Sequence, residues 1–284
     1  MTIRKPPIDL SRLPPPDLVE TLDYETLLAD RKADLLARYP DAADTLALAS
    51  SPLTKLLEES AYREVVLRQR VNDAAKSMLM AYATAADLDQ IGVSYYATER
   101  QPGESDGAYR RRLLLAYDSW STAGSEKSYV YHALEASPDI SDATAINQHA
   151  GVVLITVLSG EGDGTASATL LSAVDAALNA ERVRPLTDQV TVQSAAVTTY
   201  QVRADLTLRE GPSPSVVAPE AQAAAEEYTR TRHRLGKDVV LGAIEAALYV
   251  EGVERVTLLE PTADIDCDPT QAAYCTAVEV TIHV

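Results

Sequence analysis

The sequence contains no phenylalanine, one tryptophan, two cysteines and three methionines in 284 residues. Without phenylalanine, the apolar cores have to be packed mainly with Leu, Val, Ile and Ala. The two cysteines, Cys267 and Cys275, imply no disulfide framework, and we expect both to be buried as small apolar groups. A chain of this composition is expected to be made in a reducing compartment.

Basic residues are scarce, and long apolar runs are absent. Lys and Arg number 25 against 42 Asp and Glu, which gives a formal net charge of −17. Surfaces that bind nucleic acids or anionic membranes need clustered cations, so neither kind of partner is expected. No window approaches the ~18 apolar residues of a membrane span, and the start "MTIRKPPIDLSRLPPPD" has no apolar segment like that of a signal peptide. The sequence predicts a soluble, cytosolic protein.

The first part of the chain predicts a proline-rich arm followed by helices. Each proline in residues 6–20 fixes φ and removes an N–H donor, so this stretch is predicted to be extended. Such an arm is either disordered or laid across a neighbouring subunit. Leucines spaced at helical intervals predict a helix over residues 23–39, which Pro40 ends.

The longest helical pattern covers residues 51–84. Ser51 is a suitable N-cap and Pro52 suits the first helical position. Such a helix either packs in the core of its own chain or forms a bundle with other chains. The stripe expected to bind a partner in such a bundle consists of Leu53, Leu56, Leu57, Leu67, Val71 and Met78.

From about residue 128 the pattern changes to alternating strands and short helices. The fold class predicted is α+β, with a long-helix N-terminal region followed by two small strand–helix–strand domains. Strands are expected at 152–158, 189–195, 200–210, 253–260 and 277–284, and helices at 87–100, 107–117, 128–136, 168–180, 216–232 and 238–250. The domains expected are an arm (1–22), a helical region (23–127), a first α+β domain (128–197) and a second α+β domain (198–284).

The stretch "SGEGDGTAS" (159–167) follows an apolar strand and precedes a helix, as a nucleotide-binding loop would. However, Gly160, Gly162 and Gly164 give G-x-G-x-G rather than G-x-G-x-x-G, and no Lys follows the last glycine. Glu161 and Asp163 would repel a phosphate. We therefore expect a tight, solvent-facing turn in which Thr165 or Ser167 caps the next helix.

No metal site, cofactor site or catalytic site is expected. Two carboxylates in the glycine-rich loop are too few to form a cation site, and the acidic run from Asp264 to Asp268 departs from the EF-hand pattern at Pro269. Three consecutive arginines, 110–112, point in different directions on a helix and are expected to be solvated with local carboxylate partners. The histidines are scattered through the sequence and form no catalytic motif: His132, His149, His233 and His283.

Long strings of this sequence resemble the baseplate protein J family of contractile-tailed phages and phage-tail-like bacteriocins. They include "TLALASSPLTKLLEESAYREVVLRQRVNDAAKSMLMAYATAADLDQIG", "VLSGEGDGTAS", "VDAALNAERVRPLTDQVTVQSA" and "HRLGKDVVLGAIEAALYVEGVERVTLLEP". The resemblance runs from about residue 9 to the C-terminus and departs at residues 92–103, where this chain has a compact loop.

The resemblance implies a structural baseplate wedge subunit without enzymatic activity, assembled in the host cytoplasm and located in the baseplate of a tail or tail-like particle. It implies as partners a second copy of the chain, a smaller wedge protein, neighbouring wedges and a sheath-connecting baseplate protein. The α+β domains would link wedges into a ring around the central spike, which rearranges when the sheath contracts. The alternatives are a tail-associated hydrolase and an assembly factor that is absent from the finished particle.

Overall fold

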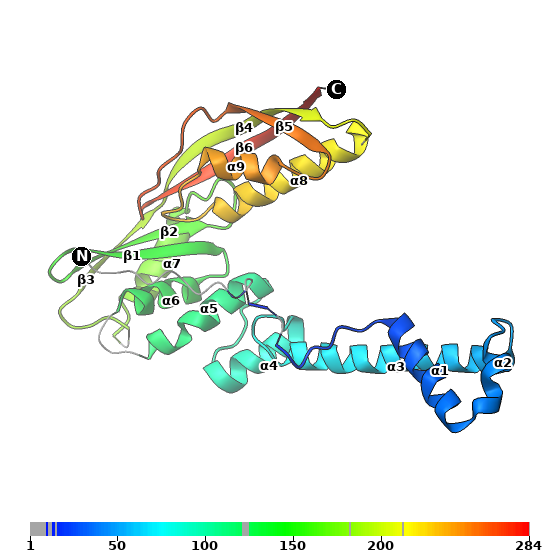
Figure 1. Ribbon diagram of the computed structural model, residues 1–284. Coiled ribbons are helices and arrows are strands. Elements are labelled where there is room, and N and C mark those ends of the chain that lie inside the picture. The colour runs from blue at the N-terminus through cyan, green and yellow to red at the C-terminus, as the bar shows by residue number, and fades with distance from the viewer. Residues whose placement is uncertain are drawn as a thin grey trace. The chain divides into compact units, whose positions relative to one another are not determined.

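The computed structural model describes residues 10, 13–14, 16–120, 125–181, 183–211 and 213–283. The chain forms two compact units, Met1–Glu99 and Arg100–Val284. The first contains only helices among its described elements, and the second contains both sheets (Figure 1). The α+β class predicted from the sequence is confirmed.

The first unit is built around one long helix. The Asp23 carboxylate caps the first helix of the unit by accepting a hydrogen bond from the Thr26 N–H, and Ser51 caps the long helix through the Leu53 N–H. The Ser51 cap lies where the sequence placed it, but the long helix ends at Ser77 instead of continuing to residue 84. The elements are α1 (Tyr24–Arg38), η2 (Pro40–Ala42), α2 (Ala43–Leu46), α3 (Pro52–Ser77) and α4 (Ala85–Tyr96).

The second unit begins with two helices and a three-stranded sheet. The strand order is β1-β2-β3, antiparallel between β1 and β2 and parallel between β2 and β3. Helices α6 and α7 share one core with alternate residues of β1 and β2, so both cover the same face of the sheet. Strand β1 was not predicted from the sequence. The elements are α5 (Asp106–Ser119), α6 (Glu126–Ala136), β1 (Ile140–His149), β2 (Val152–Ser159), α7 (Ala168–Leu178) and β3 (Gln189–Ser194).

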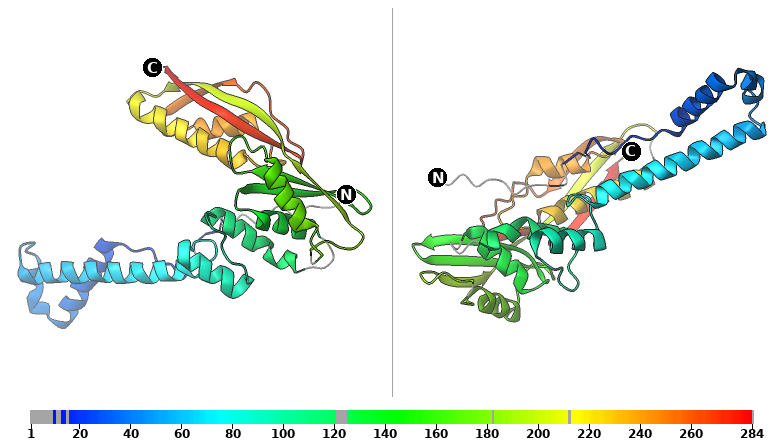
Figure 2. Two further views of the ribbon diagram at one scale, coloured as in Figure 1. Left: turned by 180° about the vertical axis from the view of Figure 1, so that it is seen from behind. Right: turned by 90° about the horizontal axis from the view of Figure 1, so that it is seen from below.

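A second three-stranded sheet completes the chain, in the order β5-β4-β6. Helices α8 and α9 cover one face of this sheet (Figure 2). Alternate residues of β4 form the larger core with these helices. Strand β6 begins at Gln271, six residues before the strand that the sequence predicted. The elements are β4 (Ala196–Leu208), α8 (Pro214–Arg232), α9 (Leu241–Leu248), β5 (Val253–Glu260) and β6 (Gln271–His283).

The residues in the cores are those expected for a sequence without phenylalanine. Their fully buried members are mostly Leu, Val, Ile and Ala, with a few tyrosines. Cys267 is buried as expected, whereas Cys275 is half-buried. Burial raises the pKa of both thiols, so neither cysteine is an activated nucleophile. Within the described residues, no helix is long and apolar enough to cross a membrane.

Candidate functional site

Helix α3 has 26 residues, which corresponds to about 39 Å of helix. Its buried residues, Thr54, Ala61 and Asn72, lie on one side. That side faces α1 and the segment that precedes α1. The exposed residues on the other sides of the helix are available to partners, as far as the first unit itself is concerned.

Polar contacts fix the covered side of α3. The Arg31 guanidinium on α1 donates hydrogen bonds to the Glu64 carboxylate on α3, and this contact and Arg68 lower the pKa of Glu64. The Asn72 side-chain amide accepts from the Glu20 N–H at 3.0 Å and donates to the Glu20 carbonyl at 2.9 Å. Both backbone groups of Glu20 are thus satisfied by one side chain that is 3% exposed.

The proline-rich arm therefore contacts its own chain at two points, one on α3 and one in the turn that follows it. Besides the Glu20 contact, the Leu13 carbonyl accepts a hydrogen bond of 2.6 Å from the Tyr82 hydroxyl. Residues 1–9, 11–12 and 15 of the predicted arm lie outside the described residues. The prediction that the arm lies across a neighbouring subunit has to allow for these contacts with its own chain.

Four of the six predicted partner-binding residues are exposed. Leu56, Leu67, Val71 and Met78 have exposed fractions of 64%, 65%, 62% and 76%. Leu53 and Leu57 are half-buried. Leu56 and Leu67 are eleven residues apart, which is close to three helical turns, so they share one face. Met78 follows eleven residues later as the C-cap of α3, with right-handed helical φ and ψ. We call Leu56, Leu67, Val71 and Met78 the α3 stripe.

A second exposed area on α3 was missed by the sequence analysis. Tyr62 and Val66 are also exposed, and their spacing of four residues places them on one face. The signal was present in the sequence as an apolar pair, but it was assigned to no surface. At about 100° per residue, this face is separate from the α3 stripe.

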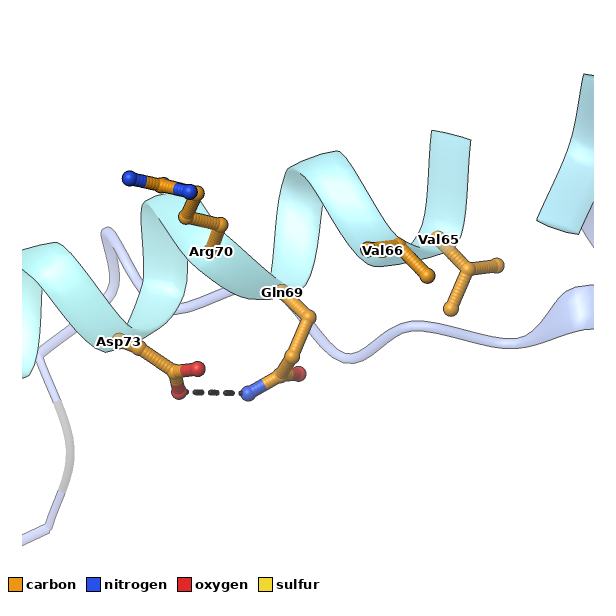
Figure 3. Close-up of a pocket in the computed structure, with 5 residues that line it drawn as sticks. All are labelled: Val65, Val66, Gln69, Arg70 and Asp73. Carbon is orange, nitrogen blue, oxygen red and sulfur yellow. Dashed lines mark hydrogen bonds between the residues drawn. The ribbon is translucent and has the colours of Figure 1, made fainter. Parts of the chain in front are cut away.

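A shallow groove runs beside this second area (Figure 3). Val65, Val66, Gln69, Arg70 and Asp73 line it, and all five come from α3. The Gln69 amide donates a hydrogen bond of 2.7 Å to the Asp73 carboxylate. A groove with walls from one helix does not enclose a small molecule, and it suits a side chain from a partner helix better.

The glycine-rich loop satisfies its own backbone groups. The Ser159 N–H donates to the Gly164 carbonyl at 2.8 Å, and the Gly160 N–H donates to the Asp139 carbonyl at 2.6 Å. The Asp163 carboxylate accepts from the Thr165 N–H at 2.9 Å, and the hydrogen bonds from Thr165 lower the pKa of Asp163. These donors point to atoms of the chain rather than to a space for a phosphate.

Two details of the predicted loop are resolved by the structure. Ser167, not Thr165, caps α7 by accepting from the Leu170 N–H. The loop is exposed at Glu161 and Asp163, but Gly164 is buried. The expectation of a solvent-facing turn is therefore wrong at Gly164.

The acidic residues near the C-terminus hold loops together. The Asp264 carboxylate accepts from the Leu241 N–H at 2.8 Å, and the Asp268 carboxylate accepts from the Thr270 N–H at 2.7 Å. Among the described residues, no three His, Cys, Asp or Glu side chains are grouped closely enough to hold a metal ion.

We expect the free energy of unfolding of Glu161→Ala to lie within about 0.5 kcal/mol of the wild type, because the side chain is exposed. We also expect calcium to leave the melting temperature of both proteins unchanged. Thermal denaturation with and without calcium tests this. A calcium-dependent rise in the wild type that Glu161→Ala abolishes would show that the loop binds the ion.

The histidines serve separate local roles. His132 Nδ1 lies 3.2 Å from the Glu135 carboxylate on the same helix, and His283 Nε2 lies 3.5 Å from the Asp205 carboxylate. His233 Nδ1 lies 2.9 Å from the Ala273 carbonyl oxygen. His149 is exposed at the end of β1. The structure does not bring these residues together.

The arginine triplet departs from its prediction at Arg112. Its guanidinium makes two hydrogen bonds to the Glu104 carboxylate, at 3.0 Å from Nε and 2.7 Å from Nη2. The Arg112 and Glu104 side chains are only 3% and 5% exposed. The expected carboxylate partner is present, but the expected solvated position is wrong. Arg112 also lies over the Tyr109 ring, 5.3 Å from its centroid.

Asp142 on β1 is a carboxyl group whose pKa is shifted by burial. Burial raises its pKa above the ordinary 3.8, although the charges of Arg234 and Arg111 and two backbone hydrogen bonds lower it. The folded chain therefore binds a proton on Asp142 more readily than the unfolded chain does. This group contributes stability at acid pH, and the contribution is lost as the pH rises through the raised pKa.

The substitution Asp142→Asn removes this titration. We expect the free energy of unfolding of Asp142→Asn minus that of the wild type to increase as the pH rises above the ordinary pKa of 3.8, because only the wild type loses stability there. Urea denaturation of both proteins from acidic to neutral pH measures the difference. A difference that stays constant over this range would contradict the assignment.

Three family models match the chain. They are described as Baseplate J-like N-terminal domain, Baseplate J-like central domain and Baseplate J-like protein C-terminal domain, and they match residues 49–102, 121–194 and 200–281. The chain is also 46% identical to "Baseplate protein J" of Escherichia phage P2 over 294 aligned residues, which cover 97% of each sequence. The first match contains the whole of α3 and all four residues of the α3 stripe.

Proposed function

Since the chain belongs to the baseplate J family, we propose that it acts as a non-enzymatic wedge subunit that binds its partners through α3. Membership of this family makes it a structural protein of the baseplate of a contractile phage tail. The finer parts of the proposal are the partners, the dimer within a wedge and the link between wedges.

The α3 stripe is the observation that carries the proposal. Leu56, Leu67 and Val71 stand mostly in solvent along one face of a long helix, and Met78, equally exposed, is the C-cap of that helix. Each would contribute on the order of 1.5–3 kcal/mol if a partner buried it completely. A helix with such a stripe fits the apolar face of another amphipathic helix.

The two separate exposed areas of α3 favour more than one helical partner. One helix could cover the α3 stripe, while a second covers Tyr62 and Val66. We assign these positions to a second copy of the chain and to a smaller wedge protein. The half-buried Leu53 and Leu57 would complete the edges of the bundle.

The α+β domains are proposed to link neighbouring wedges into a ring around the spike and to contact a sheath-connecting protein. The whole chain carries a formal net charge of −17, which favours partners with basic surfaces. Contacts of this kind are weaker than an apolar bundle and can rearrange when the sheath contracts.

The local roles of the histidines, cysteines and loop carboxylates support a structural role over that of a tail-associated hydrolase. An assembly factor differs from a wedge subunit in its final location. Mass spectrometry of purified particles separates these two functions.

Co-expression with the other tail proteins, followed by electron microscopy of the particles, tests the proposal. We expect α3 to lie in a helical bundle within each wedge and the α+β domains to lie in the ring. Particles in which α3 contacts no other chain would overturn the bundle, and particles that lack the chain would point to an assembly factor.

A further inference from the structure

We propose that the two α+β domains form one rigid lever, fixed by an interdomain joint between the first and second sheets. This goes beyond the proposed function because it states that the subunit does not bend between its two α+β domains. The joint consists of Asp142, Thr144, Gly164, His233, Leu235 and Pro269, with the chain crossing at Ala195.

The chain crosses between the domains without a linker. Strand β3 ends at Ser194 and β4 begins at Ala196. The Ala195 N–H still donates to the Val157 carbonyl of the first sheet at 2.9 Å, while the Ala196 N–H donates to the Thr270 carbonyl beside the second sheet at 3.0 Å. A single residue thus changes from one sheet to the other, which leaves little backbone to act as a hinge.

Two residues of β1 reach across to the second domain. The Asp142 carboxylate accepts a hydrogen bond of 3.2 Å from the Leu235 N–H. The Thr144 hydroxyl donates one of 2.6 Å to the Pro269 carbonyl. Residues two apart on a strand point to the same side, so β1 contacts two separate loops of the second domain at once.

Gly164 of the glycine-rich loop receives the imidazole of His233. A Cβ atom at Gly164 would lie 2.8 Å from His233 Nε2 and 2.5 Å from Leu158 Cδ1, and the glycine has φ of +94°. The other imidazole nitrogen, Nδ1, lies 2.9 Å from the Ala273 carbonyl oxygen. The imidazole is therefore held between the loop of one domain and a strand of the other.

An apolar cluster and a group of charges close the joint. Leu158 and Ala195 pack with Leu235 and Ala272 from the second domain. Around Asp142 stand the guanidinium groups of Arg234 and, from α5, Arg111. Any relative rotation of the domains would have to separate hydrogen bonds, apolar contacts and opposite charges together.

In a particle whose ring changes shape, the two α+β domains would move together as one rigid body. This consequence depends on the proposed wedge function. The rigidity itself does not, because it is a property of the isolated chain.

Double electron–electron resonance on the full chain tests the rigidity. Spin labels are attached to Ala176→Cys on α7 and Ala223→Cys on α8, two exposed alanines, in a background with Cys267→Ala and Cys275→Ala. We expect a single narrow distance distribution. A broad distribution, or one with several maxima, in this otherwise wild-type chain would overturn the proposal.

The double variant Thr144→Val/His233→Ala weakens the joint without adding bulk, and we expect it to broaden the distribution. Thr191→Val is the matched control, because the Thr191 hydroxyl donates to the Val153 carbonyl within the first sheet. Circular dichroism shows whether each variant is folded. If the double variant unfolds, Gly164→Ala replaces it, with an expected shift of the distance maximum. A folded joint variant with the same distribution as Thr191→Val would contradict the role of the joint.

Discussion

Arg112→Ala is expected to lower the free energy of unfolding of the second unit by about 3–5 kcal/mol, because it leaves the Glu104 carboxylate buried without its cation. The two side chains are 3% and 5% exposed. Glu104 also accepts a hydrogen bond of 2.9 Å from the Gln101 N–H, so the pair organises the loop before α5. Urea denaturation followed by circular dichroism measures the effect.

Two further variants test whether the loss arises because a charge stays buried without its partner. Arg230→Ala removes an exposed partner of Glu227, with side chains 73% and 57% exposed, and should cost no more than about 1 kcal/mol. The double change Arg112→Leu/Glu104→Leu should regain much of the stability lost in Arg112→Ala, because no unpaired charge stays buried. Equal losses in Arg112→Ala and Arg230→Ala would show that burial of the pair has little effect.

Leu67→Glu/Val71→Glu is expected to remove the protein from tail particles while leaving the isolated chain folded. The two residues are exposed in the chain, so each change should alter its stability by about 0.5 kcal/mol or less. In a bundle, the same changes lose about 3 kcal/mol or more of apolar burial. This corresponds to a loss of more than about 100-fold in affinity.

The measurement is the amount of the protein in purified particles after complementation of a phage that lacks its own copy. Leu186→Glu is the matched control, because Leu186 is 101% exposed and lies in the first α+β domain. It should be incorporated as well as wild type. Normal incorporation of Leu67→Glu/Val71→Glu would exclude the α3 stripe as an essential interface, and loss of both variants would show that the effect is not specific to α3.

The helices were predicted well because their signals are local. Ser51 and Pro52 mark the start of α3, and the Ser51 cap is present. The end of α3 was wrong because apolar spacing continues through Met78 and Tyr82 although the helix stops at Ser77. Seven residues, 78–84, were therefore assigned to a helix although they follow its end.

The strands were harder to predict where their inward residues are small. Strand β1 buries Ala143 and Ala145, and alanines among polar residues give little alternation for a strand. Its stability comes from pairing with β2, which is a tertiary contact. The early part of β6, with buried Ala272 and Ala273, was missed for the same reason.

The candidate surface could be predicted in part. Helical spacing alone identified the α3 stripe, but it included Leu57, which turns toward the covered side, and omitted Tyr62 and Val66. Which side of a helix its own chain covers depends on contacts such as that between Asn72 and Glu20. These contacts join residues far apart in the sequence, so spacing cannot reveal them.

The eleven-residue spacing of Leu56 and Leu67 within α3, which Met78 continues at the C-cap, has a consequence for the handedness of a bundle. Eleven residues over three turns give about 3.67 residues per turn, slightly more than the 3.6 of a straight α-helix. A seven-residue repeat would wind its partners into a left-handed supercoil, whereas this spacing favours nearly straight helices with a slight right-handed twist. A partner that matches α3 should therefore carry its own apolar residues at intervals of eleven, which gives a sequence criterion for finding it.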